Sequence, residues 1–254
     1  MHISGNTIFI PGATSGIGLE LALALHAKGN EVIVGGRRTD LLAQIVAANP
    51  AIHAVQIDTT SPDSISQAAH KVITEHPELN VLITMSGIMH FEDWSKPEGF
   101  LATAEATVTT NLLGPIRLIA AFIEHLQTRP DATIMTVSSG LAFTPLQVTP
   151  SYNATKAAIH MLSETLRLQL AGTTVKVSEL QPPSVATDLV PGQRESEFAM
   201  PLDEFITEVI GLIETNPDAR EIQVERVKFL RYGEARGDYD ETVAAVNHLD
   251  PHGK

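Results

Sequence analysis

The sequence contains no cysteine and has little aromatic character. None of its 254 residues is cysteine, and Phe, Trp and Tyr together account for 5% of the chain. A chain without cysteine can form neither a disulfide framework nor a thiolate metal site. The ten histidines also lack the spaced pairs of a zinc site. We therefore expect no bound metal, while the absence of cysteine leaves the redox compartment undetermined.

Positive charge is scarce as well. Lys and Arg number 17 against 30 Asp and Glu, which gives a formal net charge of -13. Nucleic acids and anionic membrane surfaces both require clustered cations, so we expect neither as a partner. The N-terminus lacks a basic segment followed by an apolar one, and no run of about 18 apolar residues appears. We expect a cytoplasmic protein that does not insert into a membrane.

The chain does contain a regular alternation of short apolar runs and longer helical segments. The runs are rich in β-branched residues and nearly continuous, as in strands buried on both faces of a parallel sheet. The alternation predicts an α/β fold with a doubly wound parallel sheet of about seven strands, in a single domain over residues 1–254. We expect strands at 7–10, 31–34, 53–57, 81–84, 133–137, 175–180 and, at an edge, 221–225, and helices at 19–27, 64–74, 104–126, 154–170 and 202–213.

A glycine-rich turn follows the first expected strand and precedes an apolar helix. Its glycines are spaced Gly-x-x-x-Gly-x-Gly, a variant of the general Gly-x-Gly-x-x-Gly fingerprint. Glycines at this point allow a sharp turn and bring backbone N–H groups close to a pyrophosphate at a helix N-terminus. A plain glycine-rich connection is the alternative. We interpret the turn as the phosphate site of a Rossmann-type fold, with cofactor contacts from Gly12, Thr14, Ser15, Gly16, Ile17 and Gly18.

The ends of the next two strands indicate which dinucleotide is bound. The second strand ends in two glycines followed by Arg37 and Arg38. An acidic residue there would suit a 2′-hydroxyl, whereas arginines suit a 2′-phosphate. These arginines favour NADP(H) over NAD(H), with surface arginines that bind nothing as the alternative. After the third strand, Asp58 and Thr59 are candidate adenine contacts, although Asp58 is equally suited to a helix N-cap or a turn.

A tyrosine, a lysine and a serine later in the chain form a candidate proton-transfer site. Tyr152 and Lys156 stand four residues apart, which on a helix places them on one face. A nearby ammonium favours the phenolate and lowers the pKa of a phenol from about 10. Such a spacing also arises by chance on exposed helices. Ser139 follows the fifth strand, at the edge where open sheets place ligands, and could polarise a substrate carbonyl.

The glycine-rich turn, the serine after the fifth strand and the Tyr-x-x-x-Lys pair together resemble the short-chain dehydrogenase/reductase family. Their order and spacing match it over essentially the whole chain. Within the family, segments 139–145, 154–158 and 181–183 look most like the DltE-type oxidoreductases. The resemblance implies that Tyr152 is the general acid/base and that Ser139 holds the reacting oxygen. It implies that Lys156 binds the nicotinamide ribose and lowers the pKa of Tyr152. Asn111 resembles the family's asparagine that kinks its helix and holds a water linking the lysine to solvent.

Two segments depart from the family pattern. Where the family has Asn-Asn-Ala-Gly after the fourth strand, this chain has Thr84-Met85-Ser86-Gly87. The asparagine that ties neighbouring strands together is missing, so we expect a cost in local stability. After the sixth strand the usual Pro-Gly becomes Pro-Pro, which stiffens the turn. The resemblance still implies cofactor contacts from Ser86, Gly87, Asn111, Tyr152, Lys156, Pro182, Val185 and Thr187.

These features predict an NADP-dependent oxidoreductase that interconverts a carbonyl and an alcohol of a small-molecule substrate. A catalytically silent NADP(H)-binding sensor is one alternative, and an epimerase or dehydratase that uses the cofactor transiently is another. Family members usually form dimers or tetramers through the two long helices, so a homodimer or homotetramer is expected.

Three segments should line the substrate pocket. They are 88–94, 140–147 and a substrate loop at about 183–200, with apolar candidates at Phe91, Trp94, Phe143 and Leu146. A polar C-terminal tail at about 232–254 is expected either to pack on a partner subunit or to fray.

Overall fold

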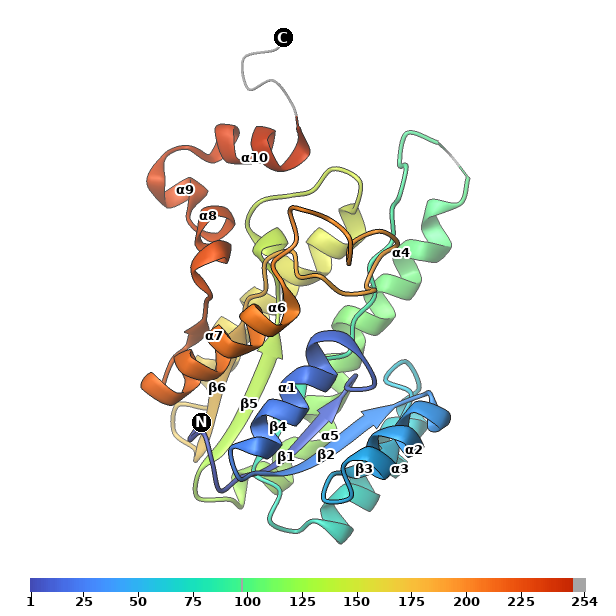
Figure 1. Ribbon diagram of the computed structural model, residues 1–254, viewed down its shortest axis with the longest axis vertical. Helices are drawn as coiled ribbons and strands as arrows, with labels where there is room; N and C mark the ends of the chain where they lie inside the picture. The colour runs from blue at the N-terminus through green and yellow to red at the C-terminus, as the bar shows by residue number, and fades with distance from the viewer. Residues whose placement is uncertain (97, 249–254) are drawn as a thin grey trace.

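Seven parallel strands form one sheet at the centre of the computed structural model, which describes residues 1–96 and 98–248 (Figure 1). The strand order is β3-β2-β1-β4-β5-β6-β7, so the winding reverses between β1 and β4, where doubly wound folds bind their ligands. The predicted fold class is confirmed. The strands are β1 Thr7–Pro11, β2 Glu31–Gly36, β3 His53–Gln56, β4 Val81–Thr84, β5 Ala132–Val137, β6 Val175–Leu180 and β7 Glu221–Ile222.

Helices cover both faces of the sheet because its strands are apolar on both sides. In β1, Ile8 and Ile10 belong to one core and Phe9 to the other. The first core includes residues of α1 (Gly16–Ala27), α2 (Thr39–Ala48) and α7 (Leu202–Thr215). The second includes residues of α3 (Pro62–Glu75) and α5 (Gly114–Gln127), with α6 (Pro150–Gln169) packed against it. The sheet therefore lies between two helical layers.

The long helix expected at 104–126 has three parts. It consists of α4 (Phe100–Val108), a π-helical turn at Thr109–Leu113, and α5. The whole of Phe100–Gln127 has the length and apolar composition to cross a membrane. Its buried residues Leu118 and Phe122, however, pack against the sheet as part of the second core. This helix is therefore a core element with one exposed apolar face.

Two other elements differ from the expected ones. Helix α2 was not expected, although it has a buried apolar stripe at Leu42 and Ile45. Strand β7 was expected over 221–225 but is only two residues long, because it pairs with β6 at Glu179 and Leu180 only. A short 3₁₀ turn at Glu225–Val227 then directs the chain away from the sheet.

The C-terminal segment packs on its own chain. Its helices are α8 (Lys228–Arg231), α9 (Gly233–Arg236) and α10 (Tyr239–Asn247), which lie beyond the carboxyl ends of the strands (Figure 1). The Asn247 side chain accepts a hydrogen bond from Gln147 N at 2.7 Å and donates one to Pro145 O at 2.9 Å. Over 232–248 the tail is therefore helical and held to its own chain rather than frayed, packing on a partner subunit stays a prediction, and the remaining six residues lie outside the described residues.

Candidate active site

A cavity of about 480 Å³ lies at the carboxyl ends of the central strands. Every predicted cofactor residue except Asn111 lines it, and so does Ser139. A second hollow, of about 980 Å³, lies between α7 and the C-terminal helices; it is lined by Met200 of the expected substrate loop but by none of the predicted catalytic or cofactor residues. The lining residues that were predicted are Gly12, Thr14, Ser15, Gly16, Ile17, Gly18, Arg37, Arg38, Asp58, Thr59, Ser86, Gly87, Ser139, Tyr152, Lys156, Pro182, Val185 and Thr187.

The glycine-rich turn is so tight that two of its positions require glycine. Gly12 has φ +97°, and a Cβ there would lie 2.5 Å from Ser86 N. A Cβ on Gly18 would lie 2.4 Å from the carbonyl oxygen of Gly12. These close approaches join β1 to the start of α1 in a compact turn that lines the cavity. The turn therefore has the shape of a phosphate cradle.

Gly87 is different, because the protein around it leaves room. A Cβ at this position would have Asn111 Oδ1 at 3.6 Å and Lys156 Nζ at 3.9 Å as its nearest neighbours, and φ is not positive. Packing within the protein therefore does not require glycine. Since Gly87 lines the cavity, the free space fits a ligand that approaches the backbone. The residues present thus fit a nicotinamide dinucleotide.

The two arginines after β2 differ in their contacts. Arg38 Nη2 donates hydrogen bonds to Thr14 Oγ1 at 2.5 Å and to Ser15 Oγ at 2.8 Å, so its guanidinium lies beside the glycine-rich turn. Arg37 is exposed at the cavity, and its positive charge helps to lower the pKa of the Asp58 carboxyl. Both cations are therefore available to an anionic group at this end of the cavity.

Asp58 lines the cavity and also forms a turn. Its Oδ1 accepts hydrogen bonds from Thr60 N at 2.9 Å and Thr60 Oγ1 at 2.7 Å. Burial raises the pKa of the Asp58 carboxyl, but these two bonds and the Arg37 charge outweigh burial and lower the pKa overall. The turn role is therefore present, and the adenine contact remains a prediction. The N-cap of α3 is Ser61, whose side chain accepts from Ser64 N at 3.3 Å.

Tyr152 and Lys156 lie near the start of α6, and both are buried, with 8% and 6% of their surface exposed. Burial raises the pKa of Tyr152 to about 12, partly opposed by a hydrogen bond with Ser139. Burial also lowers the pKa of Lys156 to about 8, partly opposed by the charge of Glu179. The expected lowering of the tyrosine pKa is therefore wrong for this structure, because burial dominates. Lys156 Nζ lies 5.4 Å from the Tyr152 ring centroid and donates instead to Val137 O at 2.8 Å.

Ser139 directly follows β5 in extended backbone and is 6% exposed. Its Oγ accepts a hydrogen bond from Leu141 N at 3.1 Å and so caps a 3₁₀ turn, Gly140–Ala142. This cap fixes the hydroxyl at the cavity, where its hydrogen bond with Tyr152 favours a lower pKa of the phenol. Ser139 and Tyr152 thus lie together, as the sequence predicted.

Asn111 sits in the π-helical turn and is buried, with 1% of its surface exposed. Its Oδ1 accepts from Ile88 N at 2.8 Å, and its Nδ2 donates to Ile88 O at 2.8 Å. The expected irregularity of this helix at Asn111 is confirmed. The side chain fixes the loop that follows β4, while its link to a water beside Lys156 remains a prediction.

The two departures from the family pattern have different consequences. The hydroxyl of Thr84 is buried and finds no hydrogen-bond partner among the described residues, which agrees with the expected local cost. At the other departure, Pro182 O accepts from Gly140 N at 2.9 Å. The substrate loop then closes on itself, because Ala186 N donates to Met200 O and Met200 N donates to Ser184 O, both at 2.8 Å. The double proline therefore leaves an ordered turn.

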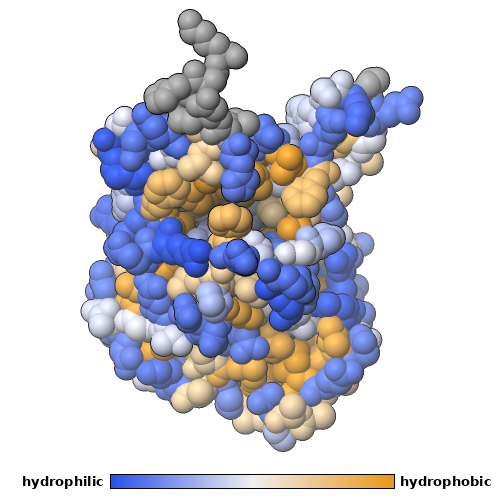
Figure 2. Space-filling view, turned by 45° about the horizontal axis from the view of Figure 1, so that its top comes forward, coloured by the Kyte–Doolittle hydropathy of each residue, from blue (hydrophilic) through white to orange (hydrophobic). Residues whose placement is uncertain are grey.

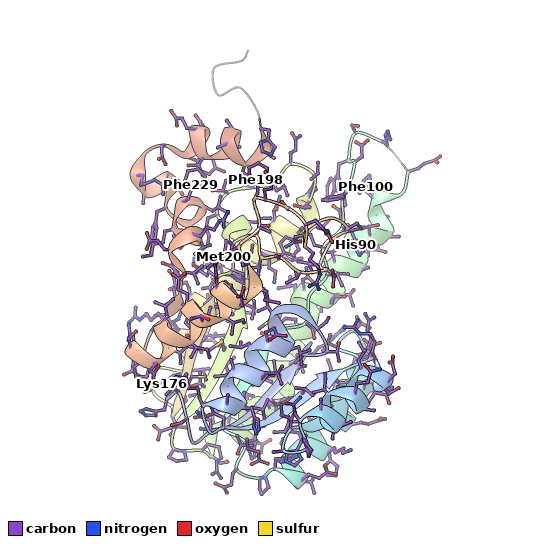
Figure 3. The ribbon with its side chains drawn as sticks, viewed as in Figure 1. His90, Phe100, Lys176, Phe198, Met200 and Phe229 are labelled. Atoms are coloured by element: carbon purple, nitrogen blue, oxygen red, sulfur yellow. The ribbon has the colours of Figure 1, made fainter. Side chains whose placement is uncertain are left out.

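The wall of the cavity next to Tyr152 comes from two of the three expected segments. Apolar side chains are visible in both the upper and the lower half of the view in Figure 2, and His90 and Phe198 lie in the loops after β4 and β6 (Figure 3). The third segment, 140–147, contributes no lining residue: Phe143 packs instead between His160, at 4.6 Å between ring centroids, and the Arg231 guanidinium at 4.1 Å. Phe91, Trp94 and Leu146 do not line the cavity either, and the outer residues that do are Ile88, Met89, His90, Asp188, Leu189 and Gln193.

A carboxylate that sequence reasoning missed joins the loop after β4 to the catalytic helix. Glu92 Oε2 accepts hydrogen bonds from Ser151 N at 3.1 Å and Ser151 Oγ at 2.8 Å. It also accepts from Trp94 Nε1 at 2.9 Å. Ser151 directly precedes Tyr152, so Glu92 caps α6 beside the site. No local sequence signal connects two segments this far apart.

Two groups of His and Glu side chains also lie close together. Glu31, His53 and His76 form one, and His160, Glu164, Glu179 and Glu221 form the other. Apart from His160 and Glu164, which lie one turn apart on α6, their residues come from segments far apart in the chain, so sequence spacing gave no sign of either group. In each group a histidine nitrogen already contacts a carboxylate, at 2.6 Å for His76 and Glu31 and at 2.9 Å for His160 and Glu179.

Comparisons with known proteins agree with this geometry. The sequence model of a family described as short chain dehydrogenase matches residues 6–197. The chain is 38% identical over 252 residues to an uncharacterised oxidoreductase of Bacillus subtilis, DltE, covering 97% of this chain and 98% of that protein.

Solved structures share the fold at lower identity. A short-chain dehydrogenase from Burkholderia cenocepacia, in complex with NADP, superposes with a TM-score of 0.81 at 24% identity, over 96% of this chain and 99% of that one. A 3-ketoacyl-(acyl-carrier-protein) reductase from Brucella melitensis, complexed with NADH, gives a TM-score of 0.78 at 20% identity, over 89% and 99% of the two chains.

Proposed function

The chain belongs to the short-chain dehydrogenase family, and on this premise we propose that it is an NADP-dependent oxidoreductase that interconverts a carbonyl and an alcohol. One observation carries the proposal. Ser139, Tyr152 and Lys156 line the same cavity as the glycine-rich turn that fits a dinucleotide phosphate. Tyr152 as proton donor, Ser139 as polarising hydroxyl and Lys156 as cation thus share the cavity with the turn that would hold the cofactor.

A nicotinamide cofactor supplies or accepts the hydride when bound, and the protein's residues do the rest. The backbone of the glycine-rich turn would hold the pyrophosphate, and Gly87 leaves room at the ribose. Ser139 donates a hydrogen bond to the substrate oxygen and polarises the carbonyl. The surrounding burial excludes water, which strengthens these interactions.

Tyr152 handles the proton. With a pKa of about 12, its hydroxyl is protonated at neutral pH, so the structure has a proton donor ready for reduction of a carbonyl. As the oxygen gains negative charge, the phenol gives up its proton, and the Lys156 ammonium stabilises the phenolate that remains. In the direction of oxidation the same phenolate removes the proton from the alcohol.

Cofactor choice rests on Arg37 and Arg38. Both line the cavity beyond β2, at the end where a dinucleotide fold holds the adenosine ribose. A 2′-phosphate would find two guanidinium groups there, and no carboxylate of the segment 35–38 competes for the position. These contacts support NADP(H) over NAD(H).

An assembly through the long helices is part of the proposal. The outer faces of α4, α5 and α6 expose large apolar side chains, which favour association. The acidic net charge of -13 supports a cytoplasmic protein with a small-molecule substrate rather than nucleic acid or a membrane surface. We propose a homodimer or homotetramer that buries Leu101, Ile116, Met161 and Leu168, whose exposed fractions are 62%, 40%, 63% and 80%.

The test is NADPH oxidation with a panel of ketones and aldehydes. Wild type should turn over at least one of them, and Tyr152→Phe should lose about 100-fold or more in kcat while still binding NADPH. Tyr239→Phe, on the half-exposed face of α10, is the matched control and should behave as wild type. Tight NADPH binding without turnover across the panel would favour the silent sensor instead.

A further inference from the structure

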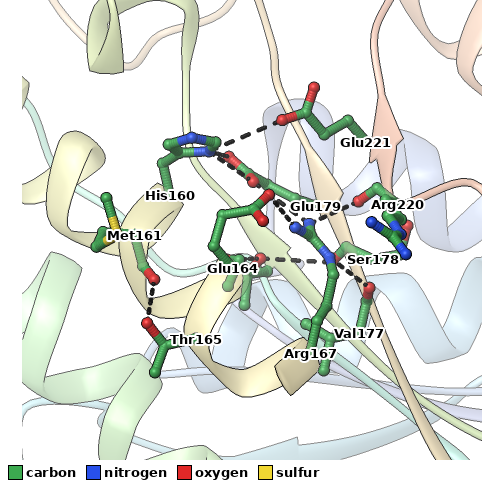
Figure 4. A network of polar contacts seen from close by, with 12 residues as sticks. His160, Met161, Glu164, Thr165, Arg167, Val177, Ser178, Glu179, Arg220 and Glu221 are labelled. Atoms are coloured by element: carbon green, nitrogen blue, oxygen red, sulfur yellow. Dashed lines mark hydrogen bonds and ion pairs between the residues drawn. The ribbon is translucent and has the colours of Figure 1, made fainter. Parts of the chain in front are cut away.

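Glu179 is a carboxylate with no exposed surface near the carboxyl end of β6. Burying an isolated charge is costly, so a buried carboxylate needs partners that hold it in its ionised form. Figure 4 shows Glu179 at the centre of a polar network that joins β6 to α6. This network lies outside the residues that the proposed reaction uses.

The direct hydrogen-bond partners of Glu179 are a serine and a histidine. The Ser138 hydroxyl donates to Oε1, and His160 Nδ1 lies 2.9 Å from Oε2. Arg167 Nη2 lies farther away, at 3.6 Å from Oε2. Burial raises the pKa of the Glu179 carboxyl, but the bonds from His160 and Ser138 outweigh it and lower the pKa. Glu179 is therefore ionised at neutral pH.

The same partners connect Glu179 to the active site. His160 stands four residues after Lys156 on α6, so the two side chains share one face of the helix. Ser138 directly follows Val137, whose carbonyl accepts the hydrogen bond from Lys156 Nζ. The carboxylate and the ammonium are thus held by consecutive residues at the end of β5. The next residue is Ser139.

The arginines around Glu179 are shared with other carboxylates, and Arg167 Nη2 is the guanidinium that forms an ion pair with Glu179, at 3.6 Å from Oε2. Glu164 forms an ion pair with Arg167, and Glu221 forms one with Arg231. The three carboxylates Glu164, Glu179 and Glu221 therefore share the two guanidinium groups of Arg167 and Arg231. Among the described residues of this cluster, Lys156 is the cation without a carboxylate in contact. The charged and titratable groups that surround Glu179 are Lys156, His160, Glu164 and Arg167 from α6, Glu221 from β7 and Arg231 from α8.

We propose that Glu179 is a positioning residue: its buried charge keeps Lys156 in the ammonium form, and its bond to Ser138 fixes the strand end that carries Ser139. This inference rests on the proposed function of Lys156 and Ser139. The charge of Glu179 is the influence that opposes the burial of Lys156, whose pKa is about 8 even with this help. Without it, Lys156 would lose its proton nearer to neutral pH.

The experiment measures the protonation of Lys156 directly. Protein labelled in its lysine side chains is titrated by NMR without substrate, and Lys156→Arg assigns the signal. In Glu179→Gln the Lys156 midpoint should fall by about one pH unit. Glu164→Gln is the matched control, because it removes a carboxylate from the same cluster at a side chain that is 45% exposed. That control, and the charge-conserving Glu179→Asp, should leave the midpoint close to wild type.

The kinetic arm separates charge from position. In Glu179→Gln the alkaline limb of kcat/KM should move to lower pH by the same amount as the NMR midpoint. Ser138→Ala keeps the charge of Glu179 but releases β5, so it should lower kcat and leave the Lys156 midpoint unchanged. Should Glu179→Gln fail to fold, Glu179→Met removes the same charge with an apolar side chain of similar size.

Equal midpoints in Glu179→Gln and Glu164→Gln would overturn the role of the charge. An unchanged kcat in Ser138→Ala would overturn the role in positioning. The NMR titration needs no turnover, so it stands even if the wild type reduces no carbonyl in the panel, and that result would instead count against the proposed function.

Discussion

The Lys156 ammonium donates a hydrogen bond to the Val137 carbonyl at 2.8 Å, and both residues are more than nine-tenths buried. The active-site cation is therefore held by the strand that leads to Ser139, while the Tyr152 ring centroid lies 5.4 Å from Lys156 Nζ. Because this cation is buried, its dehydration lowers the free energy of unfolding. This cost applies only while Lys156 is protonated, so it depends on pH.

The stability of the protein should rise with pH through a window set by Lys156. Its pKa falls from 10.5 to about 8 on burial, so between these values the unfolded chain holds the proton and the folded chain does not. The free energy of unfolding then increases with pH, by at most about 1.4 kcal/mol per pH unit from this group. Urea unfolding of wild type and Lys156→Met from pH 7.5 to 9.5 measures the difference. An identical slope in both proteins would contradict the prediction.

The glycines of the site should separate folding from ligand binding. Gly12→Ala forces a Cβ against Ser86 N at positive φ, so we expect a loss of about 2 kcal/mol or more in the free energy of unfolding. Gly87→Ala meets no close neighbour and should keep its stability but weaken NADPH binding about tenfold or more. Gly29→Ala, with φ +90° and nothing within 4 Å, controls for backbone strain alone and should cost about 1 kcal/mol. Urea unfolding and a fluorescence titration with NADPH measure the two effects.

Replacing the arginines after β2 should change cofactor choice. Charge-assisted hydrogen bonds to a phosphate contribute about 1.5–3 kcal/mol each, so Arg37→Gln should raise the Kd for NADPH about tenfold or more. The Kd for NADH should stay the same, because NADH lacks the 2′-phosphate. Arg38→Gln should act in the same direction and also loosen Thr14 and Ser15, which it contacts. Equal weakening of both cofactors by Arg37→Gln would show that this arginine does not read the 2′-phosphate.

Glu92 should matter more than the acidic residue next to it. Glu92→Gln weakens the cap on Ser151 at the start of α6, so we expect a loss of about 1 kcal/mol in stability and a higher KM. Asp93→Asn is the matched control, because among the residues that the structure describes Asp93 bonds within its own loop, to Ser95 and Lys96. Thermal unfolding and steady-state kinetics on the same preparations compare the two variants. Similar losses in both would mean that the loop tolerates either acid and that the cap on α6 contributes little.

Most of the fold could be predicted because its signals are local. Strands that are buried on both faces are apolar without interruption, and the six runs before residue 181 all became strands. Helix α2 was not predicted, although its buried residues Leu42 and Ile45 lie about one helical turn apart. Strand β7 was overestimated because the pattern beyond Ile222 continues to alternate, while the pairing partner on β6 ends at Leu180.

The cofactor end of the site could be predicted for the same reason. Its residues follow strand ends one after another, and the topology brings those ends to one edge. The remainder depends on pairs of residues far apart in the chain. Glu92 with Ser151, Asn247 with Pro145, and Phe143 against Arg231 are set by three-dimensional packing, which no spacing in the sequence encodes. The raised pKa of Tyr152 belongs to this class too, because it follows from the depth of burial.

The two edges of the sheet bear on how this protein behaves when it is concentrated. Strand β7 is two residues long and begins with Glu221, and β3 at the other edge exposes His53 and Gln56. Short, polar edges offer an incoming strand few free backbone groups, which disfavours growth of the sheet from one molecule to the next. The shortness of these two edge strands therefore disfavours fibres that grow by strand addition, independently of any chemistry in the cavity.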